Sequence, residues 1–439
     1  MSVLRSIEHI PRDQWSVANI AYWLPLKPGV TIEEVRSALG LLPQRHESLR
    51  TRYRLPADAA PAQWVEEDAR NTVEFAEIDG TDEARDALVK ASRDQTFDLE
   101  DDFGWRATIA TTDGRPRGIA FCLHHIAADD WAQGLIGRDL SPVLATPGPV
   151  PPISETTPVG GPVALALEQR STAWREQRQQ ARRFHGDILR SGLLLPNPLA
   201  PGEQLTELPP RYDGELRLDH LAVALRTHAR EVGLLPQALL LTAATLSTAV
   251  YFGELSTAWW MMTSNRFTPR WSGLVTSMNQ NVPMRANLAV EATVTDLART
   301  LQTDSFAALR YGCYDVDEIN NLSQEIIGGL PLWQYMFNYT VSADGLTGHH
   351  DNRPLDEIPH AEPTTAVRHR SAPAACYFVV ADDPHLVLRY YTTLRTADEQ
   401  QVAAILRTFE TLLRRILLDP QQPVRQLIDT VRAACQEGN

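Results

Sequence analysis

The residues best suited to chemistry are two adjacent histidines, His124 and His125, followed four positions after the second by the carboxylate of Asp129. An imidazole titrates near neutral pH, so it can accept a proton during acyl transfer. The apolar run 117–123 precedes the pair and predicts a buried strand. Neighbouring side chains on a strand point to opposite faces, so the two histidines cannot share one role. We expect one to face a cavity and the other to lock the turn.

Two interpretations of this string stay open on the residues alone. Histidines near the end of a strand are more often satisfied structural residues than catalytic ones. Asp129 and Asp130 also stand where a capping carboxylate opens a helix, predicted here over 131–140. The other interpretation is a site, because polar side chains at strand ends are where binding and catalysis tend to lie.

Size and charge limit the classes of function. The chain has 439 residues, of which 43% are hydrophobic and 22% charged, and its formal net charge is -14. These values are typical of a globular protein of two or three domains. Only two of the 41 basic residues are lysines, Lys27 and Lys90, and no basic cluster is present. We therefore expect no nucleic-acid partner.

Cysteine usage and hydropathy predict a cytoplasmic protein without a membrane partner. The cysteines form no CxxC pair, which argues against a zinc site or a disulfide framework, and we expect no metal ligands. The first fifteen residues lack the apolar core of a signal peptide. The longest apolar stretch, 238–252, contains threonines and a serine and predicts a buried helix.

The order of predicted elements indicates two lobes of mixed α/β structure. Residues 1–195 are the first lobe, and they include helices predicted after a capping box at Thr31 and over 163–195. Residues 196–214 are rich in proline and read as a linker. Residues 215–439 are the second lobe, with a buried helix over 235–252, a hairpin over 374–393 and a final helix over 397–418.

Several strings resemble the motifs of one enzyme family. The segment around His124, His125 and Asp129 resembles the HHxxxDG signature of the condensation domains of non-ribosomal peptide synthetases, with Asp130 in place of the glycine. Residues 45–53 closely resemble the second motif of these domains, RHExLRTxF. The two matches occur in the family's order, which strengthens both.

Weaker matches follow the same order along the chain. Residues 97–99 resemble the FDL element, and residues 278–285 resemble FVNTLPLR, although Gln280 occupies the asparagine position. Residues 337–339 match the FNY element. Residues 102–105 also match a DFGWG motif of plant acyltransferases, but they precede the histidines, so we interpret that match as coincidence.

The resemblance implies a free-standing acyltransferase. The fold would be two chloramphenicol-acetyltransferase-like lobes in a V-shaped pseudo-dimer with a central tunnel. The enzyme would join a carrier-protein-bound acyl or aminoacyl thioester to an amine or hydroxyl acceptor in the synthesis of non-ribosomal peptides, including antibiotics. It would bind no cofactor itself, because the substrate is presented on the phosphopantetheine arm of a carrier protein. Segments 271–281 and 342–373 of the second lobe would cross onto the first.

The resemblance also assigns roles to individual residues. His125 would be the catalytic base, while His124 and Asp129 would hold the turn. Asp129 would pair with an arginine of the second lobe, for which Arg285 is the first choice and Arg266 the reserve.

The remaining family positions would line the substrate tunnel: Asp130, Trp131 and Asn338. Asp130 leaves three outcomes open, namely an active site, a site selective for cationic or small acceptors, or a docking platform without catalysis. An acyltransferase that uses coenzyme A is a further alternative, since it would share the fold.

Overall fold

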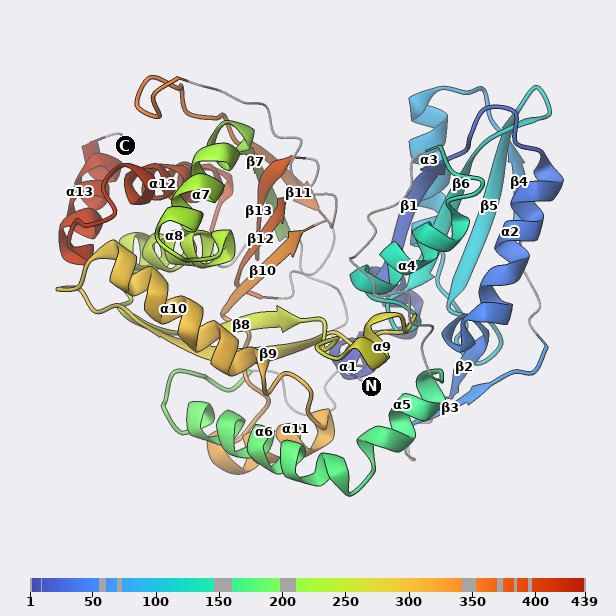
Figure 1. The fold of residues 1–439 in the computed structure, drawn as a ribbon, viewed down its shortest axis with the longest axis horizontal. Coiled ribbons are helices and arrows are strands. Elements are labelled where there is room, and N and C mark those ends of the chain that lie inside the picture. Colours follow the sequence, from blue (N-terminus) through green and yellow to red (C-terminus); the bar gives the residue numbers. More distant parts are fainter. Residues whose placement is uncertain are drawn as a thin grey trace. The chain divides into compact units, whose positions relative to one another are not determined.

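The chain forms two compact α/β units (Figure 1). The computed structural model describes residues 2–8, 10–54, 61–68, 73–145, 160–197, 211–341, 353–368, 374–382, 385–393 and 397–437. Unit 1 contains Met1–Glu176 together with Ser264–Asn279, and unit 2 contains nearly all of the remaining chain. The prediction of two α/β lobes is therefore confirmed.

The division of the chain differs from the predicted domain boundaries. The chain passes from unit 1 to unit 2 within helix α6 (Ala173–Leu189), well before residue 195. The helix predicted over 163–195 is two helices, α5 (Pro162–Gln169) and α6, because Ser171 and Thr172 interrupt it. Most of the predicted linker 196–214 lies outside the described residues.

A four-stranded sheet forms the centre of unit 1. Its strand order is β1 (Asn19–Pro25), β6 (Arg115–His124), β5 (Trp105–Thr112) and β4 (Val73–Glu77). Strand β6 pairs antiparallel with both of its neighbours, so it is an interior strand, as its apolar sequence predicts. A separate hairpin joins β2 (Thr51–Arg54) to β3 (Ala62–Val65).

Helices cover both faces of this sheet. Helix α3 (Asp82–Asp94) packs against β1 and β6. Helices α2 (Ile32–Arg45) and α4 (Asp130–Leu140) contribute to the apolar core that also includes Leu123 at the end of β6. The predicted capping box of α2 is present, and the short elements α1 (Ser2–Ile7), η1 (Arg12–Ala18), η2 (Glu47–Arg50) and α9 (Pro269–Ser272) complete the unit.

Unit 2 is built on a sheet of seven strands. Their order is β11 (Thr364–Arg368), β7 (Arg211–Arg217), β13 (Leu386–Thr393), β12 (Cys376–Asp382), β10 (Tyr335–Val341), β8 (Ser256–Thr263) and β9 (Gln280–Asn287). Its main core contains residues of the helices α7 (Asp219–Glu231), α8 (Pro236–Phe252), α10 (Val294–Leu309), α12 (Glu399–Leu418) and α13 (Val424–Glu437). A smaller core involves α6 and α11 (Val316–Ile327).

Residues 238–250 of the apolar stretch are buried in α8, as predicted, whereas Phe252 at the end of the helix is exposed. Among the described helices, none alone is long and apolar enough to cross a membrane; α7 and α8 pass that test only as a pair bent by 108°.

The prediction of a crossing loop over 342–373 is wrong for the part that the structure describes. Residues 353–368 belong to unit 2, where β11 pairs with β7. Arg414 of α12 donates hydrogen bonds to the carbonyls of Leu355 and Ile358, which holds the segment on its own unit. The other predicted segment, 271–281, lies largely within Ser264–Asn279, which groups with unit 1 although its flanking strands β8 and β9 belong to unit 2.

Candidate active site

The histidine turn is held by backbone hydrogen bonds from two sides. The His124 N–H donates to the carbonyl of Gly104 at 2.9 Å, and the His125 N–H donates to the carbonyl of Ala18 at 2.8 Å. The Ala127 N–H closes the turn on the His124 carbonyl at 2.9 Å. The backbone of both histidines is thus held by the residue before β5 and by the last residue of η1.

His124 lies in the interior of unit 1 and is 1% exposed. Its Nδ1 accepts the Ile126 N–H at 3.2 Å, so the neutral ring carries its proton on Nε2. The Phe97 ring lies perpendicular to it, with the ring centroids 6.2 Å apart. Burial, and then the nearby charges of His125 and Arg106, lower the pKa of His124 to about 3. The side chain is therefore neutral at physiological pH and enclosed by its own unit.

His125 is only partly buried, and its environment differs from that of its neighbour. Its Nδ1 is enclosed but has no hydrogen-bond partner among the described protein atoms. A buried imidazole nitrogen in a folded protein normally has a partner, either protein or water. The His125 ring is therefore free of the structural hydrogen bond that fixes His124.

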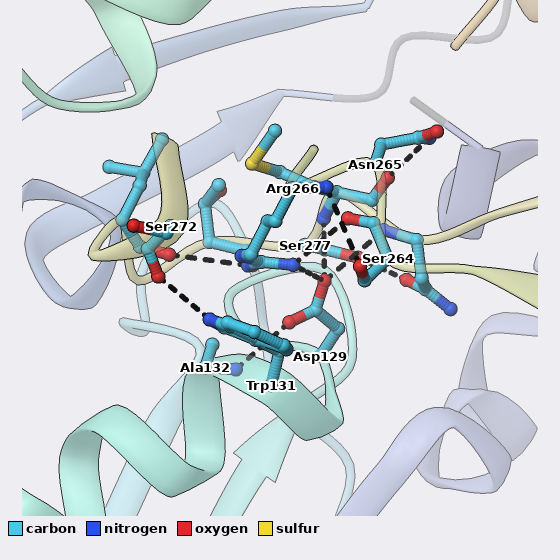
Figure 2. A network of polar contacts seen from close by, with 12 residues as sticks. Asp129, Trp131, Ala132, Ser264, Asn265, Arg266, Ser272 and Ser277 are labelled. Atoms are coloured by element: carbon cyan, nitrogen blue, oxygen red, sulfur yellow. Dashed lines mark hydrogen bonds and ion pairs between the residues drawn. The ribbon is translucent and has the colours of Figure 1, made fainter. Parts of the chain in front are cut away.

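Asp129 is the most heavily hydrogen-bonded residue of the motif (Figure 2). It caps α4, since its Oδ1 accepts the Ala132 N–H at 3.0 Å. Its Oδ2 accepts from Arg266 Nη1 at 2.7 Å, from the Met278 N–H at 2.8 Å and from the Asn279 N–H at 3.1 Å. The carboxylate thus ties the start of α4 to the Ser264–Asn279 segment.

The arginine that pairs with Asp129 is Arg266, and the first choice from the sequence, Arg285, is wrong. Arg266 also donates from Nη2 to the carbonyls of Leu274 and Thr276, so its guanidinium is fixed on both sides. Arg285 is exposed on β9 and donates to the carbonyl of Asp187 in unit 2.

The backbone explains why Arg266 is the partner. Asn265 has a φ of 55°, the left-handed conformation that asparagine tolerates better than most residues. This residue follows the end of β8, and its Nδ2 donates to the Met278 carbonyl at 2.9 Å. The reversal directs the next side chain toward Asp129 (Figure 2).

Asp130 and Trp131 occupy the first turn of α4, and their side chains have different environments. Asp130 is exposed, and no hydrogen bond of its side chain is found within the described residues. Even so, its pKa is raised, because surrounding protein atoms reduce its solvation and Asp129 lies nearby; His125 opposes this shift. Trp131 donates its indole N–H to the Ser272 carbonyl at 2.7 Å, so its polar atom holds the Ser264–Asn279 segment.

Asn338 lies in the other unit. It is partly exposed on β10, opposite Val379 of β12. The structure brings Asp129, Asp130 and Trp131 together with the histidines in unit 1, whereas the place of Asn338 in the site stays a prediction.

Residues of the RHExLRT match contact the histidine turn and helix α4. Ser48 Oγ donates to the Ala127 carbonyl at 2.6 Å, and His46 Nε2 lies 2.7 Å from Asp139 Oδ2 of α4. Burial alone would raise the pKa of Asp139, but the hydrogen bond and charge of His46, aided by Arg45 and Arg138, outweigh it and lower the pKa. This motif therefore anchors the helix that follows the histidines.

Sequence reasoning missed Gly104, although it lies in the string 102–105 that was interpreted as coincidence. A Cβ on Gly104 would lie 2.8 Å from the Ala127 Cβ, closer than such atoms approach. The turn therefore packs onto a glycine backbone. Only the pairing of β5 with β6 shows this, since nothing in the local sequence places residue 104 beside residue 127.

Comparison with known protein families gives a match over nearly the whole chain. The model of the family described as Condensation domain matches residues 11–436. Among characterised proteins, cyclosporin synthetase simA of Tolypocladium inflatum is 29% identical over 147 residues, which is 32% of this chain and 1% of the synthetase. The chain thus spans a small fraction of the synthetases that it resembles.

Solved structures show the same fold. The condensation domain from the monacolin K polyketide synthase MokA aligns with a TM-score of 0.73 and 15% identity over 93% of this chain and 94% of that one. A condensation domain of the enacyloxin polyketide synthase, described as mediating chain release, aligns with a TM-score of 0.73 and 18% identity over 95% and 82% of the two chains.

A third solved structure has a similar fold. The X-domain from teicoplanin biosynthesis, solved in complex with OxyB, aligns with a TM-score of 0.69 and 17% identity over 97% and 94%. The predicted chloramphenicol-acetyltransferase-like fold of two lobes is confirmed by these likenesses. With a family match from residue 11 to residue 436, this chain belongs to the condensation-domain family.

Proposed function

We propose that this protein is a condensation-type acyltransferase that joins a carrier-bound acyl or aminoacyl thioester to an amine or hydroxyl acceptor. The observation that carries the proposal is the contrast between the two histidines. Each ring has a nitrogen without a partner among the described residues, His124 Nε2 and His125 Nδ1, but His124 is 1% exposed and its Nδ1 is engaged by its own turn, whereas His125 is partly exposed. A base must be reached by the acceptor whose proton it takes, which favours His125.

We assign to His125 the proton transfer that accompanies attack on the thioester. The acceptor nitrogen or oxygen attacks the thioester carbon, and the carbonyl oxygen takes up the displaced electron pair. His125 accepts the proton released by the acceptor as the new bond forms. When the tetrahedral intermediate collapses, the C–S bond breaks and the proton passes to the departing thiolate. The products are an amide or ester and a free phosphopantetheine thiol on the carrier protein.

Asp129 and Arg266 contribute to this reaction by fixing the turn. Both side chains are buried and are hydrogen-bonded on both sides. Moving a proton onto Asp129 would break an ion pair that is shielded from water, so the pair favours fixed geometry over proton exchange. We assign it to positioning His125.

The proposal is tested with a panel of acyl-loaded carrier proteins, each incubated with amine and hydroxyl acceptors. Mass spectrometry would follow loss of the thioester and formation of the amide or ester. Formation of product with a carrier-bound donor supports the proposal. If the coenzyme A thioester of the same acyl group reacts as efficiently, the carrier-dependent proposal is wrong and the coenzyme A alternative replaces it.

A second candidate function is recruitment of a partner protein without catalysis. Two observations favour it: Asp130 stands in place of the motif glycine, and the X-domain of similar fold was solved in complex with OxyB. This candidate predicts that a partner or carrier protein binds while no thioester is consumed with any acceptor. That outcome would overturn the acyltransferase proposal.

Asp130 leads to a prediction about the acceptor. Asp129, and not Asp130, caps α4, so the Asp130 carboxylate is left without that structural task. An ionised carboxylate about 4 Å from a cationic acceptor would favour it by roughly 1–4 kcal/mol over a neutral one. We expect Asp130→Gly to reduce the preference for cationic over neutral amines, measured as a ratio of kcat/KM values, while turnover of neutral amines is retained. An unchanged ratio would show that Asp130 does not face the acceptor.

A further inference from the structure

The segment Ser264–Asn279, which carries Arg266 to Asp129, has little regular structure of its own. The structure describes every residue of this segment, and its only regular element is the short helix α9. Strand β8 ends before the segment and β9 begins after it, so no strand pairing holds the backbone of these described residues. Its position in unit 1 therefore depends on side-chain contacts.

Glu168 of α5 contacts α9 through both of its carboxylate oxygens. Its Oε1 accepts the indole N–H of Trp271 at 3.2 Å, and Arg270 Nη1 forms an ion pair with Oε2 at 2.8 Å. The same Oε1 accepts the indole N–H of Trp174 in α6 at 3.3 Å, which keeps the carboxylate in place. Only 23% of the Glu168 side chain is exposed, and Trp271 is buried. Hydrogen bonds to a charged acceptor that is shielded in this way are stronger than those between neutral groups.

An apolar contact one turn earlier on α5 acts on the same segment. Leu165 is buried in a cluster with Trp271, Leu274 and Met278. Residues three apart lie on one face of a helix, so Leu165 and Glu168 both face the segment. Helix α5 thus holds the part of the segment from Trp271 to Met278 by packing and by hydrogen bonding.

The part of the segment that α5 holds is the part that fixes Asp129. Arg266 Nη2 donates to the carbonyls of Leu274 and Thr276. Arg266 Nη1 and the Met278 N–H both donate to Asp129 Oδ2. A displacement of α9 would therefore move the donors that hold the Asp129 carboxylate, and with it the start of α4.

We infer that Glu168 is a positioning residue, which holds the segment that fixes Asp129 and the histidine turn. This inference rests on the proposed acyltransferase function. Glu168 is assigned no contact with substrate, and its effect on the rate passes through Arg266 and Asp129 to His125. Proton transfer requires the base at hydrogen-bond distance, and a misplacement of about 1 Å can cost a factor of about 10² in rate.

Two substitutions of Glu168 separate its hydrogen bonds from its charge. Glutamine keeps an acceptor oxygen for the two indoles, whereas alanine removes it. We expect Glu168→Ala to lower kcat about tenfold with KM unchanged, because the base is displaced while the binding surface is retained. Glu168→Gln should recover most of this loss, since a partly exposed ion pair contributes little. The rates are measured well below the melting temperature, on folded protein.

Glu291→Ala is the matched control. It removes a glutamate that pairs with Arg425 of unit 2 at the same 2.8 Å but lies far more open to solvent, and it should leave kcat unchanged. A lower melting temperature for Glu168→Ala with an unchanged kcat would overturn the inference, because Glu168 would then stabilise unit 1 without positioning the base. Equal losses of kcat in Glu168→Ala and Glu168→Gln would also overturn it.

Hydrogen exchange tests the inference without an activity assay. The Trp131 indole N–H of α4 donates to the Ser272 carbonyl, so its exchange reports whether the segment stays against α4. We expect this proton to exchange faster in Glu168→Ala than in the wild type and in Glu168→Gln. If only the indole protons of Trp174 and Trp271 exchange faster, the effect of Glu168 is local and the inference is wrong.

The two tests fail independently. If the wild type transfers no acyl group, the proposed function fails, while exchange at Trp131 still decides whether Glu168 holds the segment on α4.

Discussion

At the scale of single residues, the site depends on which polar atoms already have hydrogen-bond partners within the protein. Asp129 accepts hydrogen bonds from Ala132, Arg266, Met278 and Asn279. These contacts join the start of α4 to a segment that is more than a hundred residues further along the chain. The charge of Asp129 therefore determines local geometry, and in the proposed reaction His125 exchanges the proton.

The pair formed by Asp129 and Arg266 gives a prediction for stability. Removing one partner of a buried ion pair typically costs about 3–5 kcal/mol, because the other charge is left without compensation. We expect Asp129→Ala and Arg266→Ala each to lower the free energy of unfolding by about this amount. The double variant should lose clearly less than the sum. Arg285→Ala is the matched control and should have little effect, since that side chain is exposed.

Additive losses in urea denaturation would contradict the pairing. The sequence placed Asp129 in its role but selected the wrong arginine. Motif register favoured Arg285, whereas the contact depends on the left-handed backbone at Asn265. That conformation leaves little trace in a single sequence, because asparagine is common in many other loops.

At the scale of elements, the end of β6 owes its position to close packing against the start of β5. Gly104 accepts the His124 N–H and leaves no room for a side chain beside Ala127. Inserting a methyl group into such a contact typically costs about 1–3 kcal/mol. We expect Gly104→Ala to lower the melting temperature and to reduce acyl transfer, because the histidine turn must shift.

A control for this prediction is available in unit 2. Gly186 lies in α6, where an added Cβ would meet the flexible end of Arg190 at 3.2 Å. Gly186→Ala should be neutral or stabilising, as alanine favours helix. A melting temperature for Gly104→Ala as high as that of Gly186→Ala would show that the turn tolerates the methyl group.

The sequence predicted most of the elements and fewer of their boundaries. Capping signals and apolar runs identified α2, α8 and the buried strand β6, because those signals are local. The break between α5 and α6 and the pairing of β11 with β7 were missed. The break occurs at Ser171 and Thr172, which the helical pattern alone did not mark as an end. The pairing depends on residues distant in the chain, which periodicity does not reveal.

At the scale of the whole molecule, each unit contains a buried histidine that stays neutral. His124 in unit 1 and His185 in unit 2 are each 1% exposed, and burial lowers the pKa of each to about 3. In the unfolded chain both titrate near ~6.5. As the pH falls from ~6.5 toward 3, the unfolded state gains protons that the folded state does not, so stability declines.

His185→Phe tests this pH dependence in unit 2. Each such histidine should cost about 1.4 kcal/mol for every pH unit below ~6.5. The variant should therefore lose less stability than the wild type between pH 6.5 and 4.5, as measured by urea unfolding at each pH. Equal losses in the two proteins would mean that His185 takes up its proton in the folded state.

The central claim is that His125 is the proton acceptor of an acyltransferase, while His124 is part of the supporting turn. The most direct measurement is single-turnover acyl transfer from a loaded carrier protein to an amine by the wild type, His125→Ala and His124→Ala. Melting temperatures would be determined for all three proteins.

We expect His125→Ala to melt like the wild type and to react more slowly by a factor of about 10²–10⁴, the usual contribution of a general base. His124→Ala should instead show a lower melting temperature, because it empties a buried site. Wild-type rates for His125→Ala, with product still formed, would contradict the account and remove His125 from the mechanism.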